Sequence, residues 1–247
     1  MRIIVTNDDG IYSPGILALA RVARELGEVR IVAPDVEQSS MGHAVTAGRP
    51  LKYKRTERED FEAWRVDGTP ADCVALGVHD WEGVGLVLSG INLGFNLGNA
   101  IWHSGTLAAA KQATLLGIQG VAVSAPADPQ PDYDTLAPHV LNALEHVIGD
   151  EELPLVNINL PAVPTGLRWA RQSVRHYHGH VVPGKDPRGR EHFWFSVRPI
   201  EETEEDTDRW AVEHGAVSMT PLRLDLTDHE TLARAARRHP ADPPAGA

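Results

Sequence analysis

Apolar residues follow two spacings along the first half of the chain. Residues 3–5 are a β-branched run typical of a strand that is buried on both faces. Residues 15–26 carry apolar side chains at helical spacing, and Gly27 ends this segment. Residues 29–33 form a second short apolar run. Because a strand, a helix and another strand follow one another within about thirty residues, the pattern predicts a βαβ unit and a parallel sheet.

The same alternation continues as far as Pro161 and predicts an α/β fold with a doubly wound, mostly parallel sheet over residues 1–165. Further strands are predicted at residues 84–88, 119–124 and 155–160. Further helices are predicted at residues 68–78, 107–116 and 135–148. Two segments do not fit this alternation. Residues 51–66 alternate charged and apolar side chains and are expected to be exposed extended structure, and residues 93–103 are expected to be too irregular for a helix.

The pattern changes after Pro161, and residues 166–247 are predicted to extend the core rather than to repeat it. Two β-like runs surround a turn rich in glycine and proline, which indicates a long protruding hairpin. The expected elements of this extension are the hairpin at residues 169–196, an acidic solvated loop at 201–208, a strand at 216–222, a helix at 228–238 and a disordered tail at 240–247.

Composition and charge narrow the classes of partner. The chain has 247 residues and a formal net charge of −11, which argues against a nucleic-acid polymer or an anionic membrane as the main partner. No apolar run approaches the ~18 residues that a membrane span needs. The N-terminus enters a strand directly, without the apolar centre of a signal peptide. The single cysteine, Cys73, lies in an apolar helical segment, so we expect a buried thiol and a cytoplasmic protein.

Polar side chains follow three of the predicted strands where each strand ends. Asp8 and Asp9 come after the first strand, Ser39 lies in the loop after the second, and Asn92 follows the third. In an open parallel sheet these loops lie at the ligand-binding edge. Two adjacent carboxylates repel each other unless a proton or cation lies between them, and oxygen ligands suit Mg²⁺ or Mn²⁺. An ordinary polar turn is the alternative for the isolated motif NDDG.

A second group of residues resembles an anion site. Ser104-Gly105-Thr106 opens an alanine-rich helix, where free backbone N–H groups and hydroxyls can bind a phosphate. Asn96 and Asn99 in the preceding loop can add amide donors. Taken alone, this segment fits an ordinary serine N-cap equally well. The chain carries neither a P-loop nor a dinucleotide-binding fingerprint.

Several motifs, in a fixed order over residues 1–227, closely resemble the SurE (survival protein E) nucleotidases. They are NDDG near the N-terminus, GTPAD, SGIN followed by GxNxG and SGT, NINLP and SMTPL. The resemblance implies a Rossmann-like core with a protruding hairpin and a C-terminal helix exchanged between subunits, hence a homodimer or homotetramer. It also implies a divalent-metal-dependent phosphatase that acts on nucleoside monophosphates.

The resemblance assigns roles to individual residues. It implies that one divalent cation per subunit, Mg²⁺ or Mn²⁺, is held by Asp8, Asp9, Ser39 and Asn92. It implies that phosphate is contacted by Asn96, Ser104, Gly105 and Thr106. The chain departs from the family pattern where members often carry Asp, Tyr and Glu-Gly and this sequence has Asn99, His103 and Gln112-Ala113. None of these departures removes a metal ligand; they bear on substrate preference.

The expected activity is hydrolysis of a nucleoside monophosphate to nucleoside and phosphate, with Asp8 and Asp9 as the catalytic carboxylates. Asp8 would either orient and deprotonate the attacking water or attack phosphorus itself, and the sequence leaves both routes open. Two other functions fit the same carboxylates: a nucleotide-binding regulatory module without turnover, and a metal-dependent nucleotide-sugar transferase. The separate Ser-Gly-Thr turn favours a single terminal phosphate.

Overall fold

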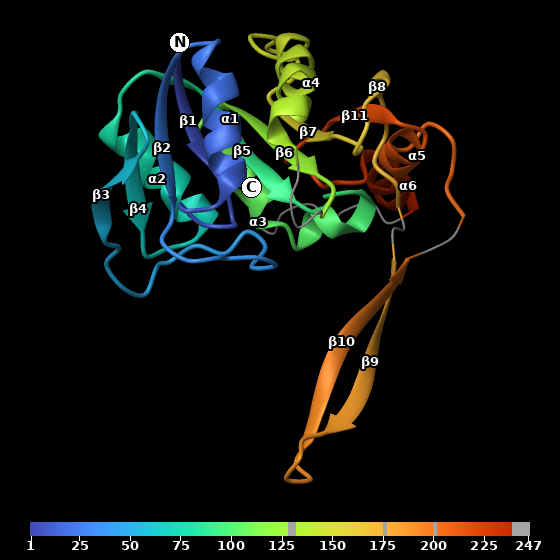
Figure 1. Cartoon of the computed structure of the whole chain (residues 1–247). Helices are drawn as coiled ribbons and strands as arrows, with labels where there is room; N and C mark the ends of the chain where they lie inside the picture. The colour runs from blue at the N-terminus through green and yellow to red at the C-terminus, as the bar shows by residue number, and fades with distance from the viewer. Residues whose placement is uncertain (128–131, 175–176, 200–201, 239–247) are drawn as a thin grey trace, which may run out of the picture.

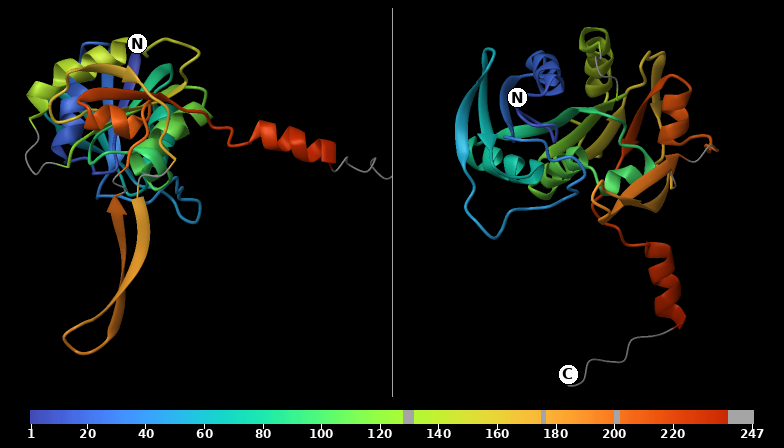
Figure 2. Two further views of the ribbon diagram at one scale, coloured as in Figure 1. Left: turned by 90° about the vertical axis from the view of Figure 1, so that its right-hand side faces the viewer. Right: turned by 60° about the horizontal axis from the view of Figure 1, so that its bottom comes forward.

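The fold is a twisted central sheet with helices on both faces, from which a long hairpin and a C-terminal helix project (Figures 1 and 2). It is seen in a computed structural model that describes residues 1–127, 132–174, 177–199 and 202–238. The predicted tail at residues 240–247 lies outside these residues. The nine strands of the central sheet are β1 (Arg2–Thr6), β2 (Glu28–Pro34), β3 (Tyr53–Arg58), β4 (Phe61–Val66), β5 (Val84–Leu93), β6 (Gln119–Ala125), β7 (Leu155–Asn159), β8 (Gly166–Trp169) and β11 (Ala216–Pro221).

The order of the strands confirms the doubly wound α/β prediction. The sheet runs β3-β4-β2-β1-β5-β6-β7-β11-β8, and β4, β2, β1, β5, β6 and β7 are all parallel. The chain therefore proceeds outward from β1 in one direction and, after β4, in the other direction from β5. The carboxyl ends of β1 and β5 meet at this point of reversal, which is where ligands bind in such sheets.

The buried run of β1 is explained by the helices that cover both faces of the sheet. Ile3 and Val5 pack in one apolar cluster, whereas Ile4 between them packs in another. The first cluster lies under α1 (Pro14–Arg24) and α4 (Tyr133–Glu145), and the second under α2 (Pro70–Asp80) and α3 (Gly105–Leu115). A parallel sheet covered in this way selects apolar residues at every position of a central strand. The thiol of Cys73 is buried in the second cluster, as expected.

The expectation for residues 51–66 was wrong in part. The segment is extended, but it forms the antiparallel pair β3–β4, and β4 joins the central sheet beside β2. Phe61, Ala63 and Val66 are buried. The alternating pattern that suggested exposure is that of an edge pair in which one face packs on the core and the other meets solvent.

Two further boundaries differ from the prediction. Residues 98–102 form a short 3₁₀ helix, η1 (Gly98–Trp102), inside the loop that was expected to be irregular. Trp169 does not belong to the hairpin; it ends β8, which pairs with β11 at the edge of the central sheet. A four-residue strand carries too few residues to show a period of its own. The hairpin consists of β9 (Tyr177–Lys185) and β10 (Glu191–Pro199), which pair only with each other.

The expectation of an acidic solvated loop at residues 201–208 was also wrong for the last residue of that segment. Asp208 is fully buried and opens α5 (Asp208–Glu213), whereas residues 204–206 are exposed as expected. The last helix, α6 (His229–Arg238), falls where the sequence predicts it, and every residue of it is exposed. Among the described residues, no helix combines the length and apolar character that crossing a membrane requires.

Candidate active site

Loops at the carboxyl ends of β1, β2 and β5 enclose one cavity. It has a volume of about 510 Å³, and its lining includes Asp8, Ser39, Asn92, Asn96 and Ser104. Backbone hydrogen bonds fix these loops to one another: the amide of Gln38 donates to the carbonyl oxygen of Asp8 at 2.7 Å, and that of Gly42 to the carbonyl of His103 at 2.9 Å. Residues separated by up to a hundred positions in sequence thus reach a common site.

Asp8 is held against the beginning of α3. The hydroxyl of Thr106 donates to Asp8 Oδ1 at 2.6 Å. A Cβ atom at Gly105 would lie 2.7 Å from the Cβ of Asp8, so only glycine permits this approach. Burial raises the pKa of the Asp8 carboxyl, while the Thr106 hydroxyl and the amides of Gly105 and Thr106 oppose that rise. The N-terminus of α3 therefore orients Asp8 and favours its charged form.

Of the two carboxylates, Asp9 has the fewer hydrogen-bond partners. Burial, and next the charge of Asp8, raise the pKa of Asp9 to about 6, against an amide of Leu93 that favours its charged form. Its Oδ2 is buried and has no hydrogen-bond partner among the described residues. A buried carboxylate oxygen without a partner is costly, and a cation would satisfy it.

Ser39 and Asn92 each keep an oxygen free to act as a ligand. The Ser39 hydroxyl donates its proton to Glu37 Oε1 at 2.8 Å, which leaves the lone pairs of its oxygen available. The Nδ2 of Asn92 donates to the carbonyl of Gly94 at 2.7 Å, which fixes the side-chain amide by its nitrogen end. Both side chains face the same cavity as Asp8.

These four side chains fit a hard divalent cation. They offer carboxylate, hydroxyl and amide oxygens, which are the donors that Mg²⁺ and Mn²⁺ prefer, and one carboxylate oxygen is buried without a partner. Across the described residues, no three His, Cys, Asp or Glu side chains gather into a cluster that could hold a metal. The donor set rests instead on two carboxylates assisted by neutral oxygens.

The Ser104-Gly105-Thr106 turn caps α3. The Ser104 Oγ accepts from the amide of Leu107 at 3.0 Å, so this serine is an N-cap as well as a lining residue of the cavity. Its hydroxyl proton remains available to a second acceptor. The Thr106 hydroxyl is already engaged by Asp8, which makes it a support of that carboxylate.

Asn96 is fixed by a polar network that the sequence pattern did not predict. Its Nδ2 donates to Ser124 Oγ at 2.9 Å and to Thr106 Oγ1 at 3.4 Å. Its amide donates to Asn159 Oδ1 at 2.8 Å, and its carbonyl accepts from Asn157 Nδ2 at 2.7 Å. Asn96 thus links the buried end of β7 to Thr106 and, through it, to Asp8. The sequence feature that could have indicated this network is the pair of asparagines, Asn157 and Asn159, in the buried strand β7.

Two further buried polar groups near these loops were not predicted from the sequence. Asp208 accepts from the amides of Gly98 at 2.9 Å and Ser173 at 3.0 Å, and so ties η1 to the segment that leads into the hairpin. The Tyr133 hydroxyl is buried and has no hydrogen-bond partner within the described part of the chain. Burial and the nearby charge of Asp9 raise the pKa of Tyr133 to about 12. No local pattern marks either side chain as part of the site.

Comparison with known proteins places this site in a family. The family model described as Survival protein SurE matches residues 3–179, which include all the site residues named above except Asp208. The chain belongs to the SurE family. The resemblance noted from its motifs is thereby confirmed.

Similar SurE proteins cover nearly the whole chain. The protein named 5'-nucleotidase SurE 1 of Thermus thermophilus is 49% identical over 237 residues, which cover 93% of this chain and 94% of the relative. The 5'-nucleotidase SurE of Deinococcus radiodurans is 43% identical, with 94% and 90% covered. The crystal structure of the SurE protein from Aquifex aeolicus superimposes with a TM-score of 0.84 at 37% identity, covering 96% of this chain and 99% of the other.

The charge of Asp9 should make this SurE chain less stable at neutral pH when metal is absent. A folded-state pKa of about 6 exceeds the ordinary value of 3.8, so the carboxyl binds its proton more tightly in the folded state. Stability is therefore lost as the pH rises from about 4 to about 6, and stays lost above. In chelator, we expect Asp9→Asn to have the same free energy of unfolding as the wild type near pH 4. Above pH 6 it should be more stable, by on the order of 1 kcal/mol after solvent screening, and its Tm should be higher.

Differential scanning fluorimetry across this pH range checks the expectation, and added Mn²⁺ should remove the difference by stabilising only the wild type. A constant difference in Tm at every pH would show that Asp9 does not titrate in this range.

Proposed function

We propose that this site hydrolyses nucleoside monophosphates to nucleoside and phosphate, with one divalent cation held by Asp8, Asp9, Ser39 and Asn92. The observation that carries the proposal is the adjacent carboxylate pair Asp8-Asp9, in which the buried Asp8 is held by Thr106 at the N-terminus of α3 and lines the cavity. Relatives that carry the name 5'-nucleotidase SurE support the same reaction. The oxygen-only ligand set supports Mg²⁺ or Mn²⁺ as the ion.

Different groups of the site would bind different oxygens of the phosphate. A bound Mg²⁺ or Mn²⁺ would neutralise charge on a phosphoryl oxygen and lower the pKa of a bound water. The free hydroxyl proton of Ser104 and the amides at the N-terminus of α3 would bind the other phosphoryl oxygens. Asp8, fixed by Thr106, would either remove the proton of a water that attacks phosphorus or attack phosphorus itself; in both routes the P–O bond to the nucleoside breaks and the nucleoside leaves. In the second route water then hydrolyses the aspartyl-phosphate to release phosphate.

Phosphate release separates this proposal from its two rivals. The test uses metal-free protein with Mn²⁺ and a panel of nucleoside monophosphates, nucleotide sugars and an acceptor sugar. Hydrolysis predicts inorganic phosphate from the monophosphates alone. A regulatory module would bind nucleotide without releasing phosphate, and a transferase would consume the nucleotide sugar.

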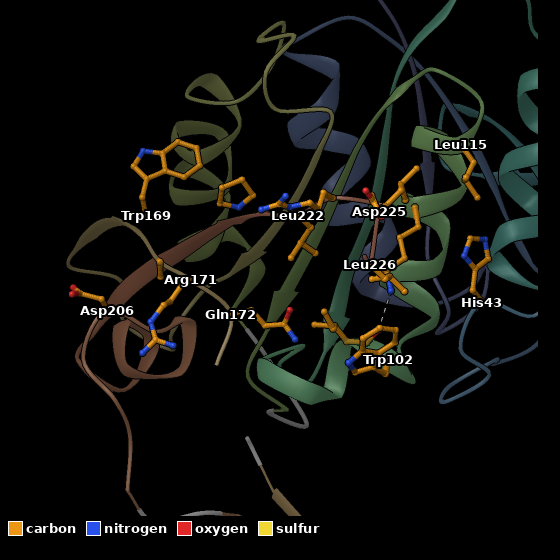
Figure 3. Close-up of a pocket in the computed structure, with 16 residues that line it drawn as sticks. His43, Trp102, Leu115, Trp169, Arg171, Gln172, Asp206, Leu222, Asp225 and Leu226 are labelled. Atoms are coloured by element: carbon orange, nitrogen blue, oxygen red, sulfur yellow. Dashed lines mark hydrogen bonds between the residues drawn. The ribbon is translucent and has the colours of Figure 1, made fainter. Parts of the chain in front are cut away.

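We also propose that the segment after residue 165 serves assembly into a homodimer or homotetramer. An apolar groove of about 900 Å³ runs along the side of α3 and the end of β11. Figure 3 shows Trp102, Leu115, Leu222 and Leu226 around it, from elements far apart in the sequence. Trp102, Leu115 and Leu226 are exposed in the single chain. An apolar groove of this kind is typical of a protein–protein contact.

The occupant proposed for this groove is the C-terminal segment of a second copy. The chain leaves the groove at Leu226, and α6 stands away from the sheet in both views of Figure 2. This helix has ten residues, all exposed, and isolated helices of that length are marginal in water. Its apolar side chains, such as Leu232, therefore need a surface that its own core does not supply.

Truncation after Leu226 should weaken the assembly. We expect light scattering to show a smaller assembly than for the full chain, and the Tm to fall, because α6 is lost and the groove is left without its occupant. As a control, removal of residues 239–247 alone should change neither the number of chains in the assembly nor the Tm. A full-length chain that is monomeric at micromolar concentration would contradict the assembly proposal.

The location proposed for the protein is the cytoplasm, since its single cysteine is a buried free thiol and is suited to a reducing compartment.

A further inference from the structure

The cavity is larger than a phosphate group, and an aromatic side chain of the hairpin contributes to its lining. Its lining includes the polar side chains of Asp8, Asn96 and Ser104. Phe195 of the hairpin also lines it, although this residue lies about ninety positions after Ser104 in the sequence. A volume of about 510 Å³ is the size of a site for a whole small molecule, of which the phosphate would be one part.

The position of the Phe195 ring is fixed by a glycine on the opposite strand. Phe195 pairs with Val181, and Gly179 lies two residues nearer to the base of the hairpin. A Cβ atom at position 179 would lie 2.7 Å from Cζ and 3.1 Å from Cε2 of Phe195. The ring therefore leans over the backbone of Gly179, toward the core, in space that any other residue would fill. It is nonetheless 69% exposed, so most of its surface remains free.

We propose that Phe195 is the residue against which the base of the substrate stacks. The inference rests on the proposed function and gives a role to the aromatic part of the cavity lining. An aromatic ring held in place by the protein and open to solvent binds a base through its π face at little cost in conformational entropy. Stacking of this kind tolerates different bases, so it predicts acceptance of purine and pyrimidine monophosphates with a preference for the larger purines.

Phe193 provides a comparison within the same strand. It lies two residues from Phe195 on the same face of β10 and is 65% exposed, yet it is absent from the lining of the cavity. Exposure of a hairpin aromatic is therefore common to both residues, whereas placement at the cavity belongs to Phe195. Since both side chains are on the surface of a two-stranded hairpin, replacing either one should leave the core folded.

Steady-state kinetics with adenosine 5'-monophosphate and ribose 5-phosphate test the inference, because the second substrate keeps the sugar phosphate and lacks the base. Phe195→Ala should raise KM for the nucleotide by roughly 5- to 100-fold, the range expected for loss of one base–aromatic stack. The KM for ribose 5-phosphate should stay within about twofold of the wild type, since no stack is lost. Phe193→Ala should leave both substrates unchanged, and Phe195→Trp should keep the low KM for the nucleotide.

Gly179→Ala provides a second route to the same prediction. The added methyl group displaces the ring, so KM should rise for the nucleotide and not for ribose 5-phosphate. Equal losses with both substrates in Phe195→Ala, or an equal effect of Phe193→Ala, would overturn the stacking role while leaving hydrolysis established. Absence of phosphate release from both substrates by the wild type would instead refute the proposed function, and this inference with it.

Discussion

Asp8→Asn should abolish hydrolysis and leave the fold intact. The amide keeps an oxygen that can accept from Thr106, as Oδ1 does at 2.6 Å, so the contact with α3 survives. The charge that we propose to bind the cation, and to serve as base or nucleophile, is lost. We expect kcat to fall by roughly 10³-fold or more, the scale of removing one member of a group that acts as a unit. The Tm of the metal-free protein should hold or rise, because a buried charge beside Asp9 is removed.

Asp35→Asn is the matched control for this prediction. Asp35 follows β2 as Asp8 follows β1, but it lines a different hollow on the surface, beside Lys52 and Arg65. Its replacement should leave kcat near the wild-type value. Near wild-type activity of Asp8→Asn at saturating Mn²⁺ would place the chemistry elsewhere, and an equal loss in Asp35→Asn would indicate a general electrostatic effect.

Ser104→Ala should impair catalysis without weakening metal binding. The substitution removes the hydroxyl that is free to donate to a phosphoryl oxygen, and loss of one transition-state donor typically costs on the order of 10²-fold in kcat. It also removes the N-cap of α3, which should lower the stability by about 1 kcal/mol. Kinetics and calorimetric titration with Mn²⁺, at a temperature well below both Tm values, measure the two effects separately.

Ser104→Thr controls for the cap, since threonine retains both the acceptor for the Leu107 amide and a donor. It should keep most of the activity that Ser104→Ala loses. A large fall in Mn²⁺ affinity in Ser104→Ala would show that this serine belongs with the metal ligands rather than with the phosphate site.

The doubly wound fold could be predicted because its central strands and helices carry their periodicity locally. Residues 3–5 show a β-branched run whose alternate members face two different apolar clusters. The errors fall where the deciding contact is remote. Trp169 was assigned to the hairpin because its pairing with Met219 on β11 is fifty residues away in sequence. Asp208 was taken as solvated because the amides that it accepts from lie at Gly98 and Ser173.

The residues of the candidate site likewise fall into those that the sequence identifies and those whose role depends on remote contacts. Candidate site residues such as Asp8, Asp9 and Ser104 can be identified from the sequence by their residue type and by their position at the ends of predicted strands and helices. The role of Thr106 could not be deduced, since its hydroxyl donates to a carboxylate 98 positions away, on another element. The support of Asn96 by Asn157 and Asn159 likewise appears only when β7 is placed beside the loop. Sequence patterns identify the groups that do chemistry more readily than the groups that hold them.

Titration of metal-free protein with Mn²⁺, while hydrolysis of a nucleoside monophosphate is followed, tests the central claim most directly. We expect no activity in chelator and a linear rise of activity with added Mn²⁺ that saturates at one ion per chain, with no such rise in Asp8→Asn. Full activity in the presence of chelator would contradict a metal-dependent reaction at this site. So would a rise of activity with Mn²⁺ that is the same in Asp8→Asn as in the wild type.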